Sequence, residues 1–195
     1  MDERLISTVP DDATSVVFVE GMSDRAALET LARRRGRDLP AEGVAVVSIG
    51  GSKNIRRFLD RYGPHGRNLS IAGLCDAAEV GDFQRALERT GLGAVLTPLD
   101  LESLGFYVCD RDLEDELIRA VGPATIERIF EAHGDLGSFR TFQRQPAQRG
   151  RSIEEHLHRF MGTQGGRKIE YAGYLVEALD LERTPRPLDR VLAHL

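Results

Sequence analysis

Acidic side chains follow the ends of three apolar segments, where carboxylates can bind a divalent cation. Glu20 follows the apolar run Val16–Val19, and Asp76 follows the run Leu69–Cys75. A third acidic group lies after a later apolar run and comprises Asp110, Asp112 and Glu114. Clustered carboxylates repel one another unless a cation lies between them, and oxygen ligands suit Mg²⁺ or Mn²⁺. We therefore predict a Mg²⁺ or Mn²⁺ site. The alternative is that each acid stabilises the N-terminus of a helix.

These acids can meet only if the apolar segments form neighbouring parallel strands. Apolar segments alternate with helical stretches, and the connections are too long for hairpins, which indicates a mostly parallel sheet with helices on both faces. Besides the segments above, we expect strands at Val44–Ile49, Ala94–Leu96 and Gly105–Val108. The carboxyl ends of parallel strands share one rim of the sheet, where α/β proteins place ligands. The predicted fold class is therefore α/β.

The signals for strands stop after Gly122-Pro123. We predict a polar segment at residues 1–13, an α/β domain at 14–122 and a helical extension at 123–195, with breaks in the helices at 134–150 and 162–166. Ser23 and Asp112 are the expected N-caps of two helices, because their short polar side chains can accept backbone hydrogen bonds.

Composition narrows the class of protein. The net charge of −5 argues against a broad basic face that grips nucleic acid. No apolar run is long enough to span a membrane, and the charged N-terminus lacks a signal-peptide core, so we expect a cytoplasmic protein. Cys75 and Cys109 follow apolar runs and are expected to be buried thiols. The five histidines show no zinc-ligand spacing, and we expect structural or surface roles for them.

The motifs resemble those of the Toprim fold, which topoisomerases, primases and OLD-family nucleases share. Val19-Glu20-Gly21 after an apolar strand, and a second strand ending in Asp76, are similar to the core of that fold. The longer match over residues 19–24, with a second acid at Asp24, is typical of the OLD type. Further similarity covers Ile49–Gly51, Arg111–Leu117 and Lys168–Ala172. The resemblance is good over residues 14–122 and loose over 123–195.

The resemblance implies a two-metal nuclease that hydrolyses phosphodiester bonds of DNA. It assigns Glu20 and Asp76 to one metal. It assigns a second metal to Asp24, Asp112 and Glu114. Lys168 would stabilise charge on the phosphoryl oxygens, so that Glu20, Asp76 and Lys168 form the expected catalytic set.

The resemblance also bears on partners. OLD nucleases carry an ATPase domain with a phosphate loop, and this sequence has no Gly-x-x-x-x-Gly-Lys-Ser/Thr motif. We expect a stand-alone Toprim module whose ATPase, if one is used, is a separate partner chain. The sequence leaves the oligomeric state open, a homodimer included.

One departure from the family pattern lies just after the third apolar segment. Toprim proteins have Asp-x-Asp there, whereas this chain reads Asp76-Ala77-Ala78-Glu79. In an extended segment the side chains at 76 and 78 share one side, so the second carboxylate would be missing. Glu79 could replace it as a metal ligand only if the chain turns early; its other expected role is an acid in the first turn of a helix.

This departure keeps a second function open, a degenerate Toprim binding or regulatory module that acts through a partner with little or no catalysis. Nucleotidyl transfer of the primase kind would use the same metal chemistry, but no zinc-binding or primase-like flanking segment accompanies it.

A basic segment at residues 136–152 is the candidate for nucleic-acid contact. The segment contains no acid. It has two phenylalanines, at 139 and 142, and the four arginines Arg140, Arg144, Arg149 and Arg151. Arginines beside aromatic rings suit phosphate contact and base stacking. The alternative is a solvated loop that its phenylalanines anchor to the core.

Overall fold

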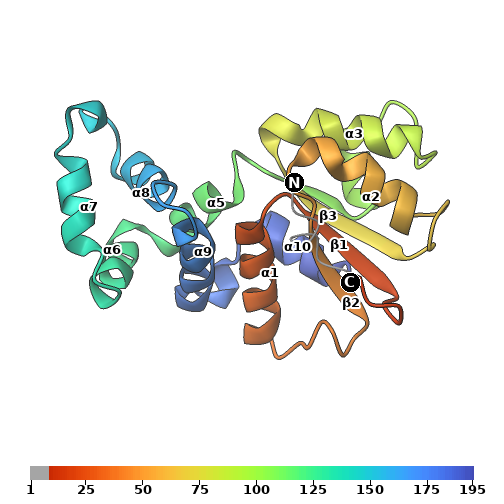
Figure 1. Cartoon of the computed structure of the whole chain (residues 1–195), viewed down its shortest axis with the longest axis horizontal. Coiled ribbons are helices and arrows are strands. Elements are labelled where there is room, and N and C mark those ends of the chain that lie inside the picture. The colour runs from red at the N-terminus through yellow and green to blue at the C-terminus, as the bar shows by residue number, and fades with distance from the viewer. Residues whose placement is uncertain (1–8) are drawn as a thin grey trace.

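The protein is described here by a computed structural model, which covers residues 9–195. Its centre is a four-stranded parallel sheet with the strand order β2-β1-β3-β4 (Figure 1). The strands are β1 (Ser15–Val19), β2 (Val44–Ser48), β3 (Ser70–Asp76) and β4 (Phe106–Cys109). The α/β class and the parallel sheet are confirmed.

Both faces of the sheet are buried, which explains why the strands are continuously apolar rather than alternating. In β1, Val17 and Val19 belong to the hydrophobic cluster on one face, and Val16 and Phe18 to the cluster on the other. All four side chains are 0% exposed. Neighbouring strands are in parallel register, with Val16 opposite Ala45 of β2 and opposite Ile71 of β3.

Helices cover the two faces as predicted. On the face of Phe18 lie α2 (Ile55–Tyr62), α3 (Val80–Arg89) and α4 (Pro98–Ser103), and the Phe58, Phe83 and Leu101 side chains pack there. On the face of Val17 lie α1 (Met22–Arg34) and α10 (Arg186–Ala193).

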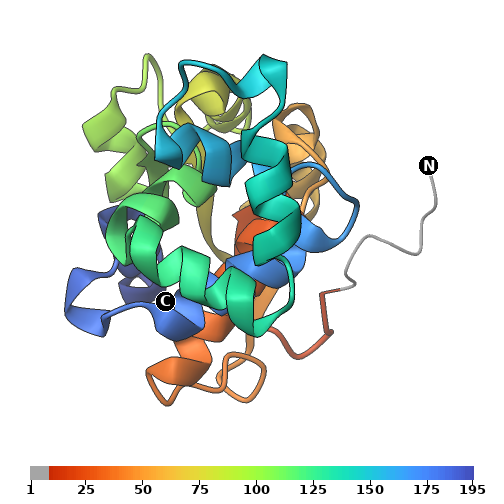
Figure 2. The ribbon, with the colours of Figure 1, turned by 90° about the vertical axis from the view of Figure 1, so that its left-hand side faces the viewer.

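The remaining helices form the second part of the molecule, on the left in Figure 1. They are α5 (Leu113–Val121), α6 (Pro123–Ala132), α7 (Leu136–Gln143), α8 (Ile153–Met161) and α9 (Arg167–Ala178). Figure 2 shows most of them in front of the sheet, coloured green to light blue. Their core is aromatic, since the Phe130 ring lies 5.0 Å from Phe139, 5.1 Å from Phe160 and 4.9 Å from Tyr171 between centroids.

Helix α9 packs along α1, and the two helices run in the same direction. At their C-terminal ends, Arg34 donates to the carbonyl oxygens of Val176 at 2.7 Å and Leu179 at 2.6 Å. These carbonyls close α9, where a helix leaves carbonyl groups without internal partners. In the middle, Gly173 faces Thr30 closely enough that an added Cβ would lie 3.8 Å from the threonine hydroxyl. The extension therefore shares one hydrophobic core with the sheet; the domain boundary at residue 122 stays a prediction.

Three local predictions are wrong. Residues Ala94–Leu96 form no strand, because Val95 has a φ of 54° and is 87% exposed, and so cannot continue an extended, buried segment. Helix α7 lies inside the break expected at 134–150, because its apolar side chains Phe139 and Phe142 are buried. Gly21, not Ser23, is the N-cap of α1, and Ser23 is buried in the first turn.

Two other predictions concern the ends and the membrane. The polar segment predicted at residues 1–13 lies mostly outside the described residues. Within residues 9–195, no helix is both long and apolar enough to cross a bilayer.

We predict that Arg34→Ala destabilises the protein by about 1–3 kcal/mol, because two carbonyls at the end of α9 lose a charged donor. Urea unfolding followed by circular dichroism measures this change. Arg128→Ala is the matched control: Arg128 lies exposed on α6 and contacts the Thr125 hydroxyl at 3.0 Å, so we expect less than about 0.5 kcal/mol. Equal effects of the two substitutions would contradict the role given to Arg34.

Candidate metal centre

Glu20 and Asp76 meet at the carboxyl ends of adjacent strands. The backbone N–H of Asp76 donates to Glu20 Oε1 at 3.0 Å, which fixes the Glu20 carboxylate against the end of β3. Burial raises the pKa of Glu20 even though this hydrogen bond opposes the change, and the charges of Glu79 and Asp82 act in the same direction as burial.

Asp24 enters from the first turn of α1. Its Oδ2 accepts the N–H of the N-cap residue Gly21 at 2.8 Å, so the turn that begins the helix also aims this carboxylate. Burial, followed by the charge of Glu114, raises the pKa of Asp24 to about 7. The Gly21 N–H and Lys168 limit the increase.

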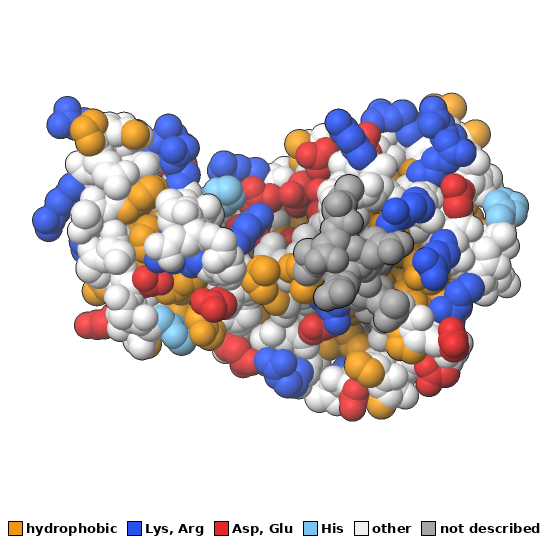
Figure 3. All heavy atoms as spheres, in the orientation of Figure 1, with side chains coloured by type: hydrophobic (Ala, Val, Ile, Leu, Met, Phe, Trp, Pro, Cys, Tyr) orange, Lys and Arg blue, Asp and Glu red, His pale blue; other side chains and the backbone are white. Residues whose placement is uncertain are grey.

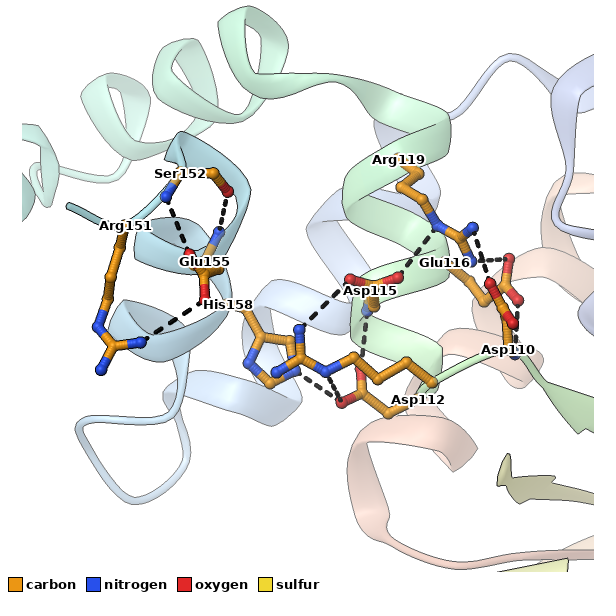
Figure 4. A network of polar contacts seen from close by, with 10 residues as sticks. Asp110, Asp112, Asp115, Glu116, Arg119, Arg151, Ser152, Glu155 and His158 are labelled. Carbon is orange, nitrogen blue, oxygen red and sulfur yellow. Dashed lines mark hydrogen bonds and ion pairs between the residues drawn. The ribbon is translucent and has the colours of Figure 1, made fainter. Parts of the chain in front are cut away.

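Asp112 caps α5, as predicted, and binds His158 of α8 as well. Asp112 Oδ1 accepts the Asp115 N–H at 2.8 Å, and Oδ2 lies 2.7 Å from His158 Nε2. Figure 4 shows this imidazole pointing from α8 toward the start of α5. Burial acts to raise the pKa of Asp112, but the His158 and Asp115 hydrogen bonds outweigh it, and the pKa is lowered.

Glu114 is the most buried acid of the group, with 4% of its surface exposed. Its Oε2 lies 3.0 Å from Lys168 Nζ, which comes from the first turn of α9. Its Oε1 is buried and has no hydrogen-bond partner among the described residues. A buried carboxylate oxygen without a partner is costly in a folded protein, and a bound cation would satisfy it.

Glu79 reaches the same place because the chain turns directly after β3. Residues Ala77–Glu79 form a 3₁₀ turn, so the extended geometry that we expected for positions 76 to 78 is wrong, and Ala78 is exposed. The Glu79 charge acts on Glu20, and Glu79 Oε2 accepts from Ser52 Oγ at 3.1 Å. An acid therefore stands near Glu20 even though position 78 is alanine.

The electrostatics connect all these groups into one cluster. Burial raises the pKa of Asp76 to about 7, with contributions from the charges of Glu20, Asp24, Asp112 and Glu114. The positive charge of Lys168 acts to lower the pKa values of Glu20 and Asp24. Burial acts against its charge, but Glu114, Asp24 and Asp112 together raise its pKa, so it stays protonated. The structure thus brings together the six acids and the lysine that the sequence singled out.

Neighbouring acids are neutralised by arginines and stay outside the cluster. Arg119 contacts Asp110 at 3.3 Å, Asp115 at 3.0 Å and Glu116 at 3.1 Å (Figure 4). Asp110 has a side chain that is 78% exposed. Of the five acids at positions 110–116, only Asp112 and Glu114 therefore face the centre.

Within residues 9–195, one group of side chains brings its ligand atoms close enough together for a divalent cation. Asp112, Glu114 and His158 each offer one ligand atom, and these atoms lie within 4.8 Å of one another. Sequence reasoning missed His158, since a lone histidine two positions from His156 carries no ligand spacing; only the packing of α8 against α5 reveals it. Ser52 and Asp82, which contact each other at 2.8 Å beside Glu79, were also missed.

The basic segment behaves differently from the acids. Arg140 pairs with Glu127 at 2.6 Å, and Arg151 pairs with Glu155 at 3.6 Å. Phe139 is fully buried and Phe142 is 8% exposed, so both rings anchor α7 to the core. Arg144 and Arg149 are exposed. A nucleic-acid role for this segment stays a prediction. Cys75 and Cys109 are free and buried, as expected.

Comparison with known proteins finds a family similarity over part of the chain. Residues 13–75 match the model of the TOPRIM domain of overcoming lysogenization defect (OLD) protein-like sequences. This match covers 63 of the 195 residues. The matched residues include Glu20, Asp24 and the strand β3 up to Cys75, and stop one residue before Asp76.

Solved structures share the fold over nearly the whole chain. The C-terminal region of the Burkholderia pseudomallei OLD protein superposes with a TM-score of 0.71 at 22% identity, covering 93% of this chain and 96% of that one. The C-terminal region of the Xanthomonas campestris pv. campestris OLD protein gives a TM-score of 0.74 at 21% identity, covering 93% and 91%. The search of curated proteins returned no match. The shared fold thus includes the helical extension of this chain as well as its sheet.

We predict that Asp76→Asn stabilises the metal-free protein at high pH. Because the folded state raises the pKa of Asp76 to about 7, the unfolded chain loses this proton first, and the contribution of Asp76 to stability falls as pH rises from about 4 to 7. Above pH 7 we expect the variant to be more stable by on the order of 1 kcal/mol, since partial exposure screens the repulsion.

Thermal melts in a chelating buffer from pH 4 to 8 measure this difference. Asp60→Asn, on the exposed face of α2, is the control. A difference between Asp76→Asn and wild type that does not grow with pH would contradict the crowding of charge in the centre.

Proposed function

We propose that the protein is a divalent-metal-dependent nuclease that hydrolyses phosphodiester bonds of DNA. The observation that carries the proposal is the buried Glu114, with one oxygen on Lys168 and the other without a partner, inside a cluster of strand-end and helix-start acids. The match of residues 13–75 to the OLD-like TOPRIM model supports the same function. Neutral side chains would fill this place at lower cost if the cluster had only a structural role.

In this proposal the acids would bind the metal ions, and Lys168 would stabilise charge on the phosphate. Glu20, Asp76 and Glu79 would hold one cation on the strand-end side. Asp24, Asp112 and Glu114 would hold another on the helix side. Cations held there would polarise the phosphoryl oxygens and lower the pKa of a bound water. Lys168, kept protonated by the acids around it, would add a fixed positive charge toward the developing charge on the phosphate.

The alternative function is a degenerate Toprim module that binds or regulates through a partner. Ala78 favours it, whereas the early turn that brings Glu79 beside Ser52 and Glu20 favours the nuclease. A separate ATPase chain as partner belongs to the proposal, by analogy with the domain architecture of OLD nucleases.

We predict that Glu20→Ala abolishes metal-stimulated cleavage of DNA, with a loss on the order of 10²-fold or more, because the carboxylate that joins β1 to β3 is removed. Plasmid and linear DNA with Mg²⁺ or Mn²⁺ are the substrates. Glu131→Ala, exposed on α6, is the matched control and should cleave like wild type.

Cleavage that Glu20→Ala leaves intact would contradict the nuclease proposal. Calorimetry with Mg²⁺ or Mn²⁺ separates the two functions. Tight metal binding by the natural protein that Glu20→Ala removes supports the nuclease, whereas weak or absent binding by the natural protein supports the degenerate module.

The imidazole of His158 makes the centre a mixed oxygen and nitrogen site, which suits Mn²⁺ better than Mg²⁺. We predict that His158→Gln weakens Mn²⁺ binding by about tenfold and leaves Mg²⁺ binding nearly unchanged. Isothermal titration calorimetry with each metal measures this, and His65→Gln on an exposed turn is the control. An equal loss for both metals would show that His158 acts only by holding Asp112.

A further inference from the structure

A small cationic pocket lies between α2 and α3, next to the metal centre. Its volume is about 150 Å³. Its polar lining consists of Ser52, Lys53, Arg56, Asp82, Arg85 and Arg89. Four of these six side chains are basic, although the whole chain carries a net charge of −5. Positive charge is therefore concentrated here against the overall balance.

Two of these cations are held by neighbouring acids and two are not. Arg85 pairs with Asp82, and Arg56 lies 3.6 Å from Asp60 in an exposed pair. Lys53 and Arg89 are exposed and have no ion-pair partner within the described part of the chain. Long basic side chains that point into solvent without an acid are available to an anionic ligand.

The pocket and the metal centre share one hydroxyl group. Ser52 Oγ lies 2.8 Å from Asp82 Oδ2 and 3.1 Å from Glu79 Oε2. Asp82 interacts electrostatically with both the metal centre and the pocket. Its charge acts to raise the pKa of Glu20 in the centre, and Lys53 of the pocket acts to lower the pKa of Asp82. Figure 3 shows acidic side chains in the hollow between the two parts of the molecule and basic side chains over α2 and α3 at its upper right.

We propose that Lys53 and Arg89, with Arg56 and Arg85, bind backbone phosphates of a DNA strand next to the phosphate that enters the metal centre. This inference rests on the proposed function. A DNA strand carries one negative charge per nucleotide, and only the phosphate at the centre can be neutralised by cations held there. Its neighbours need protein cations, and the α2–α3 pocket supplies them directly beside the acids.

The geometry favours this pocket over the basic segment near α7. In that segment Arg140 already pairs with Glu127, and Arg151 with Glu155. Helix α7 lies at the opposite end of the molecule from α2 and α3 (Figure 1). Arg144 and Arg149, which are exposed there, provide a matched pair of cations for comparison.

The test compares two double variants, Lys53→Ala with Arg89→Ala, and Arg144→Ala with Arg149→Ala. Fluorescence anisotropy measures binding of a labelled 20-nucleotide DNA strand, single and duplex, in Ca²⁺ over a series of salt concentrations. A gel checks that the DNA stays intact. We expect the first variant to lose about tenfold in affinity and to show a salt slope smaller by roughly 1.5, the value for two lost phosphate contacts. The second variant should lose clearly less affinity than the first.

Three results would overturn the inference: no DNA binding by the wild-type protein, a loss only in the Arg144/Arg149 variant, or tighter binding of the same strand made of RNA. Circular dichroism shows that each variant is folded. This assay measures binding separately from cleavage. A protein that binds DNA through Lys53 and Arg89 but does not cleave it with either Mg²⁺ or Mn²⁺ would contradict the nuclease proposal and leave this DNA-binding surface established.

Discussion

The parallel packing of α1 against α9 is the contact on which the candidate metal centre depends. At one end Arg34 closes the carbonyl end of α9, and at the other end Asp24 and Lys168 come close enough to influence each other's pKa. In between, Gly173 of α9 faces Thr30 of α1. Since Asp24 belongs to the sheet's first crossover and Lys168 to the extension, this packing sets the register between the two parts of the chain. A shift of α9 by one turn would carry Lys168 away from Glu114.

The same packing explains why the extension cannot be treated as an appendage. Helices α5 and α8 meet where Asp112 binds His158, and α9 supplies Lys168 to Glu114. The acids thus receive their positive partners from helices far along the chain. The carboxylates still outnumber these positive partners. Burial and then the neighbouring acids raise the pKa values of Asp24 and Asp76 to about 7. The fold holds carboxylates together at a cost in stability, which is the usual condition of a centre arranged for cations rather than for stability.

The acids could be predicted from the sequence because strand ends are visible in it. Placing Glu20 and Asp76 side by side requires only that the apolar runs before them form parallel strands. Placing Asp112 requires only that a helix begins there. His158 could not be predicted, because its position depends on how α8 packs against α5. The strand expected at Ala94–Leu96 failed because three apolar residues carry too little information to exclude a left-handed turn at Val95. Local sequence patterns were enough to predict the acids at the edge of the sheet. The position of His158 depends on contacts between helices that are distant in the sequence, which such patterns do not show.

The turn after β3 shows how a missing motif residue can mislead. Alternation along a strand holds only while the strand continues, and here it ends at Asp76. The 3₁₀ turn moves Ala78 outward and leaves Glu79 facing Ser52 and Glu20. Ser52 in turn contacts Asp82, which lines the basic pocket with Arg85 and Lys53. One hydroxyl therefore joins the negative centre to the positive surface. If the protein acts on DNA as proposed, this arrangement, more than the net charge of −5, would determine where the strand approaches.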